Sequence, residues 1–81
     1  MSVSPTVTEM AEKLAAECIA VQKEIGNDRL FMEVGEVLGA SSQTLEEAFL
    51  TSVRTRMSEV QGREFLKKKL LEHRAAQKDS T

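Results

Sequence analysis

Residues 30–50 read LFMEVGEVLGASSQTLEEAFL, and this stretch decides the fold. Apolar residues at helical spacing continue to Leu38 and stop at Gly39. Four small or polar residues follow, and a second helical run begins at Thr44 or Leu45. The pattern predicts two helices joined by a sharp corner. Gly35 and Gly39 suit a close helix crossing and a helix stop, respectively.

A longer helix is predicted before this corner, over residues 7–25. Thr6 can accept a hydrogen bond from the backbone of Glu9, which completes a capping box. Gly26 stands where a helix ends in the left-handed conformation, and Asp28 is the expected cap of a short helix over 29–38. The first helix carries a heptad-like apolar seam at Val7, Ala11, Leu14, Cys18, Val21 and Ile25.

A third helix is predicted over residues 44–61, with Thr44 as its cap and Glu47 as the capping-box partner. At Gly62 the apolar phase slips, so residues 63–77 form either a fourth helix or a continuation of the third. The sequence therefore predicts an all-α, three- to four-helix bundle with a helix-turn-helix-like corner at 31–50. We expect one domain over 1–81, with disordered ends at 1–5 and 78–81.

Composition supports the all-α class, since strong helix formers dominate and aromatic residues are only 4% of the chain. Cys18 is the single cysteine, so no internal disulfide can form. The sequence shows no signal peptide and no apolar run long enough to cross a bilayer. These features predict an intracellular protein of the reducing cytoplasm.

Charge divides the chain into two unlike halves. Residues 1–50 carry nine acidic and three basic residues, a net charge of −6, whereas residues 51–81 carry eight basic and four acidic residues, a net charge of +4. This asymmetry suggests that the C-terminal helix packs antiparallel on the acidic half of the same chain, or on a second copy of it. A nucleic-acid surface would have to lie in the basic half.

No residue pattern points to catalysis. The single histidine, His73, lies near the predicted C-terminal end of a helix, where a solvated role is expected. The acid pairs Glu9/Glu12 and Glu33/Glu36 have no histidine or aspartate beside them to complete a metal shell. We expect neither enzyme activity nor a metal or cofactor site.

Residues 31–50 resemble the twenty-residue helix-turn-helix pattern, with Gly35 at the crossing, Gly39 and Ser41 at the turn and Leu45 as an apolar anchor. Ala40 departs from the pattern, because a branched aliphatic residue is usual there. The resemblance implies DNA as an alternative partner. In that hypothesis Ser42, Gln43 and Glu46 would read bases, and basic residues would hold the phosphates. These are Arg54, Arg56, Lys67, Lys68 and Lys69. Glu46 and Glu47 would oppose the phosphates.

The other hypothesis is a small helical interaction or regulatory protein. Four apolar residues on an otherwise charged helix suggest a dimerisation or partner surface: Phe65, Leu66, Leu70 and Leu71. The partner would be another protein or a second copy, giving a homodimer. The basic C-terminal helix also suits a membrane surface, but we do not expect a membrane partner.

Overall fold

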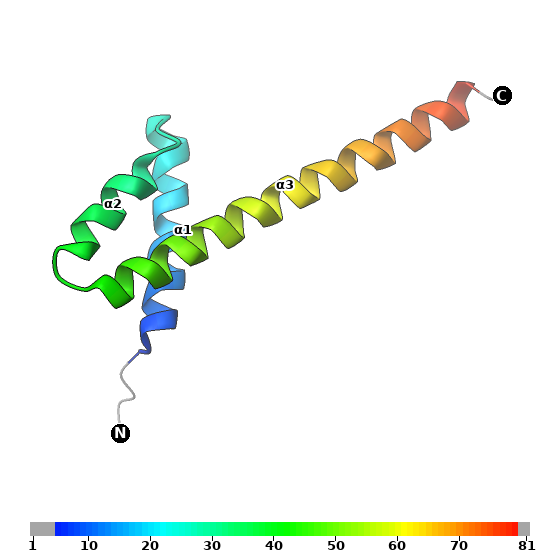
Figure 1. The fold of residues 1–81 in the computed structure, drawn as a ribbon. Coiled ribbons are helices and arrows are strands. Elements are labelled where there is room, and N and C mark those ends of the chain that lie inside the picture. Colours follow the sequence, from blue (N-terminus) through cyan, green and yellow to red (C-terminus); the bar gives the residue numbers. More distant parts are fainter. Residues whose placement is uncertain (1–4, 80–81) are drawn as a thin grey trace.

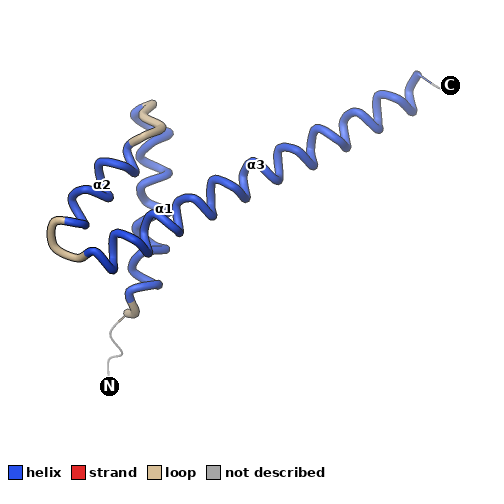
Figure 2. Tube along the Cα trace, in the orientation of Figure 1, coloured by secondary structure: helices blue, strands red, loops and turns tan. Residues whose placement is uncertain are grey.

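The computed structural model describes residues 5–79, which form three helices and no strand. They are α1 (Val7–Ile25), α2 (Leu30–Gly39) and α3 (Gln43–Asp79), as Figure 1 shows. Short loops at residues 26–29 and 40–42 join them (Figure 2). The predicted all-α class is confirmed. Residues 1–4 and 80–81, which belong to the predicted disordered ends, lie outside the described residues, whereas Lys78 and Asp79 are helical.

The core lies where α3 crosses α1. Ala11 and Ala15 are one helical turn apart, and their small side chains let Phe49 and Val53 of α3 approach the α1 backbone closely. Five apolar residues are fully buried in this way: Ala11, Ala15, Cys18, Phe49 and Val53. Partly buried residues of α2, among them Phe31 and Leu38, cover the cluster on a further side.

The α1 seam is only partly internal. Ala11 and Cys18 are buried, as the seam predicts, but Val7, Val21 and Ile25 are exposed. The buried face is rotated towards Ala15 and Gln22. A row of apolar side chains on α1 therefore remains exposed in large part.

Capping explains where the helices begin, and two of the three predicted caps were wrong. The backbone N–H of Glu9 donates to Oγ1 of Thr6 at 3.1 Å, as expected. Before α2, Asp28 is not the cap, because the cap residue is Arg29 and no side chain hydrogen-bonds to the first turn; Oδ1 of Asn27 accepts from the N–H of Arg29 at 3.0 Å within the turn that precedes the helix. Before α3, Ser42 replaces Thr44, because its Oγ accepts from the N–H of Leu45 at 3.1 Å. The helix therefore begins at Gln43.

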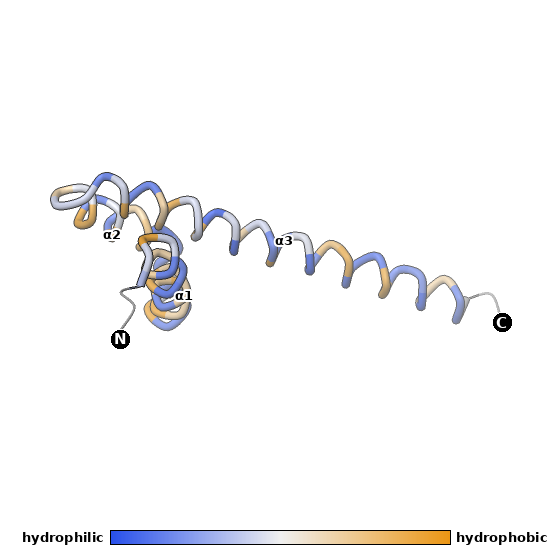
Figure 3. Tube along the Cα trace, turned by 90° about the horizontal axis from the view of Figure 1, so that it is seen from below, coloured by the Kyte–Doolittle hydropathy of each residue, from blue (hydrophilic) through white to orange (hydrophobic). Residues whose placement is uncertain are grey.

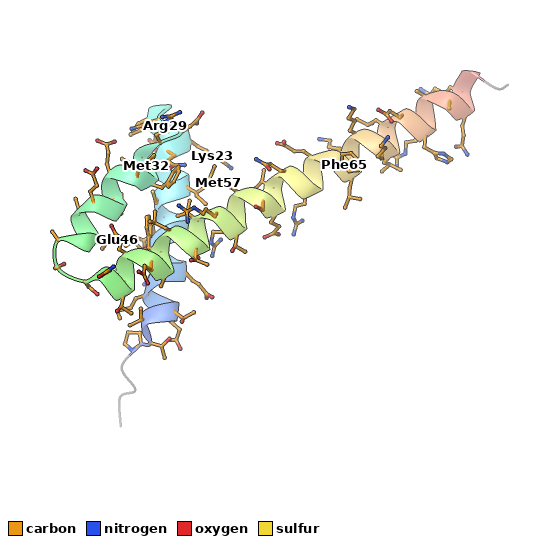
Figure 4. The ribbon with its side chains drawn as sticks, in the orientation of Figure 1. Lys23, Arg29, Met32, Glu46, Met57 and Phe65 are labelled. Atoms are coloured by element: carbon orange, nitrogen blue, oxygen red, sulfur yellow. The ribbon has the colours of Figure 1, made fainter. Side chains whose placement is uncertain are left out.

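Residues of α3 lie close to both glycines of α2 at the corner between the two helices. A Cβ added at Gly35 would lie 3.2 Å from Cδ2 of Leu50, so the absence of a side chain allows the crossing. A Cβ at Gly39 would lie 2.5 Å from Oε2 of Glu46. The Glu46 carboxylate thus turns back over the end of α2 (Figure 4).

The predicted break at Gly62 is absent, because α3 is one helix of 37 residues. Predicted helices 44–61 and 63–77 are therefore a single element. Nor does the C-terminal part fold back on the acidic half of its own chain, since α3 continues straight away from α1 and α2 (Figure 1). The molecule is consequently elongated. Its radius of gyration is 18.1 Å, against about 12 Å for a compact domain of this length.

Candidate protein-binding surface

The part of α3 that extends beyond the crossing is exposed along its whole length. Every residue from Met57 to Lys78 is exposed to solvent. We call residues 60–78 the projecting segment. Figure 3 shows hydrophobic (orange) and hydrophilic (blue) positions alternating along this segment, including the part that lies far from α1 and α2. The C-terminal half of α3 is therefore exposed to solvent around its whole circumference.

Four side chains of the projecting segment form what we call the apolar arc. They are 47–69% exposed and comprise Phe65, Leu66, Leu70 and Leu71. At 100° per residue these positions spread over about two thirds of the helix circumference. They are the residues that the sequence predicted for protein interaction, and the structure leaves all four exposed, although they do not share one face of the helix. Figure 4 shows Phe65 midway along it, away from the other helices.

Local pairs order the charged side chains around the arc. Nζ of Lys69 lies 5.6 Å from the centre of the Phe65 ring and 3.5 Å from Oε2 of Glu72. Closer to the crossing, Nη2 of Arg63 lies 2.6 Å from Oε1 of Glu59. All these groups are exposed, and such pairs contribute little to stability. Lys69 lies over one face of the Phe65 ring, whereas Leu66, Leu70 and Leu71 stay exposed.

A shallow groove lies at the base of the projecting segment, where α1 and α3 diverge. Its volume is about 260 Å³, and Ile19, Met57 and Val60 supply most of its apolar lining. Lys23 and Arg56 stand at its rim. Figure 4 shows Lys23 of α1 near Met57 of α3. Exposed apolar surface thus continues from the groove onto the projecting segment.

The residues predicted for DNA contact are not brought to one place. The Ser42 hydroxyl caps α3, and Nε2 of Gln43 donates to Oε1 of Glu47 at 3.5 Å. Arg56 is half-buried, with Nη2 donating to the Glu12 carbonyl oxygen at 3.4 Å. Arg54 is exposed near the crossing. The lysine run at 67–69 begins 24 positions after Gln43, which corresponds to about 36 Å of helix.

The described residues contain no group of three or more His, Cys, Asp or Glu side chains that could hold a metal ion. Cys18 is buried, and this burial raises the pKa of its thiol. His73 is exposed on the projecting segment. None of the described helices has an apolar stretch that would span a membrane.

Sequence reasoning missed two contacts near the groove. Oε1 of Gln22 accepts from the Phe31 N–H at 2.9 Å, which ties α1 to the start of α2. Arg56 attaches α3 to α1 through the Glu12 carbonyl. A glutamine within one turn of seam residues gave a weak signal for the first contact. The second depends on tertiary approach alone.

Comparison with known proteins gives no further guide to the site, since no family model, curated protein or solved structure matches the chain.

Proposed function

We propose that this protein works without catalysis, as a small helical interaction protein whose binding element is the projecting segment. The observation that carries the proposal is the exposed apolar arc on a helix that leaves its own core. Single exposed apolar residues are normal on a protein surface. Four of them, together on an unsupported helix, mark a surface that another protein covers.

Helix energetics support this function. Most helices in proteins are held by packing of one face against the rest of the fold, because propensity alone leaves a helix marginal in water. Beyond Gln61 the projecting segment lies outside the α1–α3 groove, and Gly62 costs it about 1 kcal/mol relative to alanine. Covering the exposed part of the apolar arc would contribute roughly 3–7 kcal/mol before the entropy of association is counted. A partner would therefore stabilise the segment as it binds.

The test is affinity capture from nuclease-treated extract with tagged protein as bait. Leu66→Gln/Leu70→Gln removes half of the apolar arc. Glu64→Gln/Lys68→Gln is its matched control, with the same spacing on the same helix and the same net charge. We expect the wild type and the control to retain protein, including an untagged copy of the chain, and the leucine variant to lose it. Equal capture by all three forms would contradict the proposal.

DNA binding is the second candidate function, and the α2–α3 corner supports it. The two helices are joined by residues 40–42 only, and Gly35 lies at the contact with Leu50, as in a helix-turn-helix unit. Two observations count against DNA binding. Glu47 is exposed in the first turns of α3, and the first basic residue after the corner is Arg54. Salt-dependent binding to duplex DNA, weakened by Arg54→Ala, would put this function first.

A further inference from the structure

We propose that the partner is a second copy of the chain, and that the projecting segment of each copy docks on an acid-edged face of α1 in the other. This inference rests on the proposed function, since it names the partner of the same binding element. It also names the receiving surface, which belongs to a different helix.

The receiving surface is the more exposed side of the α1 seam. Met10, Val21 and Ile25 are 41–59% exposed there, and Leu14 is half-buried between them. A hollow of about 320 Å³ opens on this side between α1 and the start of α3, and it is lined by Met10, Lys13, Leu14, Glu17 and Leu45. We call Met10, Leu14, Val21 and Ile25, with the exposed Glu17 and Glu24 at their edge, the α1 face. It extends over residues 10–25 of α1, about 23 Å of helix.

Charge matches the α1 face to the projecting segment. Glu17 lies four residues before Val21 and Glu24 three residues after it, so both carboxylates border that side chain. Lys67 and Arg74 stand in the same relation to Leu71 on the projecting segment. An apolar centre between two acids would therefore meet an apolar centre between two bases.

Other arrangements of the same halves are disfavoured. Within one chain they stay apart, because α3 is continuous and leads its basic end away from α1 (Figure 1). Two projecting segments side by side would bring two basic surfaces together, since residues 51–81 carry a net charge of +4. Docking of the basic segment on the acidic half of a second copy avoids both problems.

The surface area is sufficient for such a dimer. The chain exposes 6644 Å², against about 4,900 Å² for a compact monomer of 9.0 kDa. The excess is larger than the roughly 800 Å² that each partner buries in a standard interface. Because each copy has one segment and one α1 face, reciprocal docking closes the assembly as a two-fold dimer.

The test is a charge exchange followed by sedimentation of the full chain. Glu17→Lys/Glu24→Lys places two bases beside Val21 on the α1 face, and Lys67→Glu/Arg74→Glu places two acids beside Leu71 on the projecting segment, whose net charge falls from +4 to 0. Each variant alone would place like charges in both contacts of a dimer, whereas an equimolar mixture restores opposite charges in both. Glu36→Lys/Glu47→Lys is the control, with the charge change of the first variant placed outside the α1 face. All six side chains are exposed or half-exposed, and circular dichroism checks that each variant stays helical.

We expect dimers for the wild type, the control and the mixture, and monomers for each exchange variant alone. Glu24→Lys and Arg74→Glu form a milder second pair if a double variant loses helix. A monomeric wild type, dimers of either variant alone, or a mixture that stays monomeric would overturn the inference. Open chains of many copies would overturn the reciprocal arrangement. The affinity-capture experiment separates this inference from the proposed function. If Leu66→Gln/Leu70→Gln no longer captures protein but Glu17→Lys/Glu24→Lys still does, the proposed function stands and the partner is a different protein.

Discussion

The side-chain amide of Gln22 is the polar group on which the α1–α2 junction depends. It is buried on α1, and its Oε1 accepts from the Phe31 N–H at 2.9 Å. The thiol of Cys18 also lies 3.8 Å from this oxygen. A buried backbone donor that loses its acceptor costs about 1–3 kcal/mol. The junction is therefore sensitive to a change that leaves the shape of the side chain nearly intact.

Gln22→Met is expected to lower the free energy of unfolding by about 1–3 kcal/mol, because the Phe31 N–H loses its acceptor. Urea unfolding monitored by circular dichroism measures the loss. Gln61→Met makes the same change at an exposed position of α3 and should alter the stability little. Equal effects of the two substitutions would show that the hydrogen bond to Phe31 does not hold the junction.

Substitution of alanine for Gly26 and for Gly62, two glycines with open space around them, should change the stability in opposite directions. A Cβ would meet nothing within 4 Å at Gly26 or at Gly62, but Gly26 has φ 69°. Gly26→Ala should therefore destabilise the fold by about 1–2 kcal/mol through backbone strain alone. Gly62→Ala should increase the helix content of the projecting segment by removing a helix penalty of about 1 kcal/mol. Circular dichroism and urea unfolding measure both changes, and a shared sign would contradict the assigned backbone conformations.

Burial of Cys18 predicts a pH dependence of stability. Because desolvation raises the pKa of the thiol in the folded protein, the unfolded chain loses the thiol proton at lower pH. The contribution of Cys18 is thus complete at neutral pH and falls as the pH rises above the ordinary thiol pKa. The difference in unfolding free energy between the wild type and Cys18→Ala should narrow in alkaline buffer. A difference that is constant or widens with pH would contradict a desolvated thiol.

At the scale of the elements, the start of α3 distinguishes the observed cap from the predicted one. The Ser42 hydroxyl accepts from the Leu45 N–H, whereas Thr44 is an exposed residue inside the helix. Ser42→Ala should lower stability by about 1 kcal/mol, and Thr44→Ala should have little effect or raise it slightly. Thermal unfolding of the two variants decides between the caps. A larger loss for Thr44→Ala would move the helix start to the predicted position.

Helix positions could be read from the sequence because they depend on local patterns. Spacing of apolar residues, together with Gly26 and Gly39, placed α1 and α2 within one residue of the observed bounds. Caps were harder to predict, because several consecutive residues could accept the same hydrogen bond. Ser42 and Thr44 both carry a hydroxyl that could cap α3, whereas α2 begins after Arg29 without any side-chain cap. Only the direction of the chain after the previous helix decides whether a side chain reaches a free N–H.

The course of α3 could not be predicted for a different reason. Gly62 weakens a helix without ending it, so a phase slip at this residue fits either a bend or a change of surroundings. The structure shows the second case, in which Val53 is buried and residues after Gln61 lie beyond the α1–α3 groove. The apolar arc could be predicted because its residues are adjacent in sequence. The exposure of Val21 and Ile25 on α1 could not, since a seam does not reveal which of its sides the chain will cover.

At the scale of the whole molecule, an elongated shape and an opposed charge distribution belong together. The core of five fully buried residues is small, and much apolar surface remains on α1 and on the projecting segment. A domain of this size gains stability by association, because its own core removes a limited area from water. The proposed dimer would cover the exposed apolar residues of α1 and of the projecting segment through one reciprocal contact. Its stability should accordingly depend on protein concentration.

Amide hydrogen exchange of the projecting segment at low and at high protein concentration tests this dependence most directly. We predict that residues 60–78 exchange rapidly in dilute solution and become protected as the concentration rises. Residues around the α1–α3 crossing, which pack within one chain, should be protected at both concentrations. The same protection of residues 60–78 at every concentration would contradict the claim that a second copy covers the projecting segment.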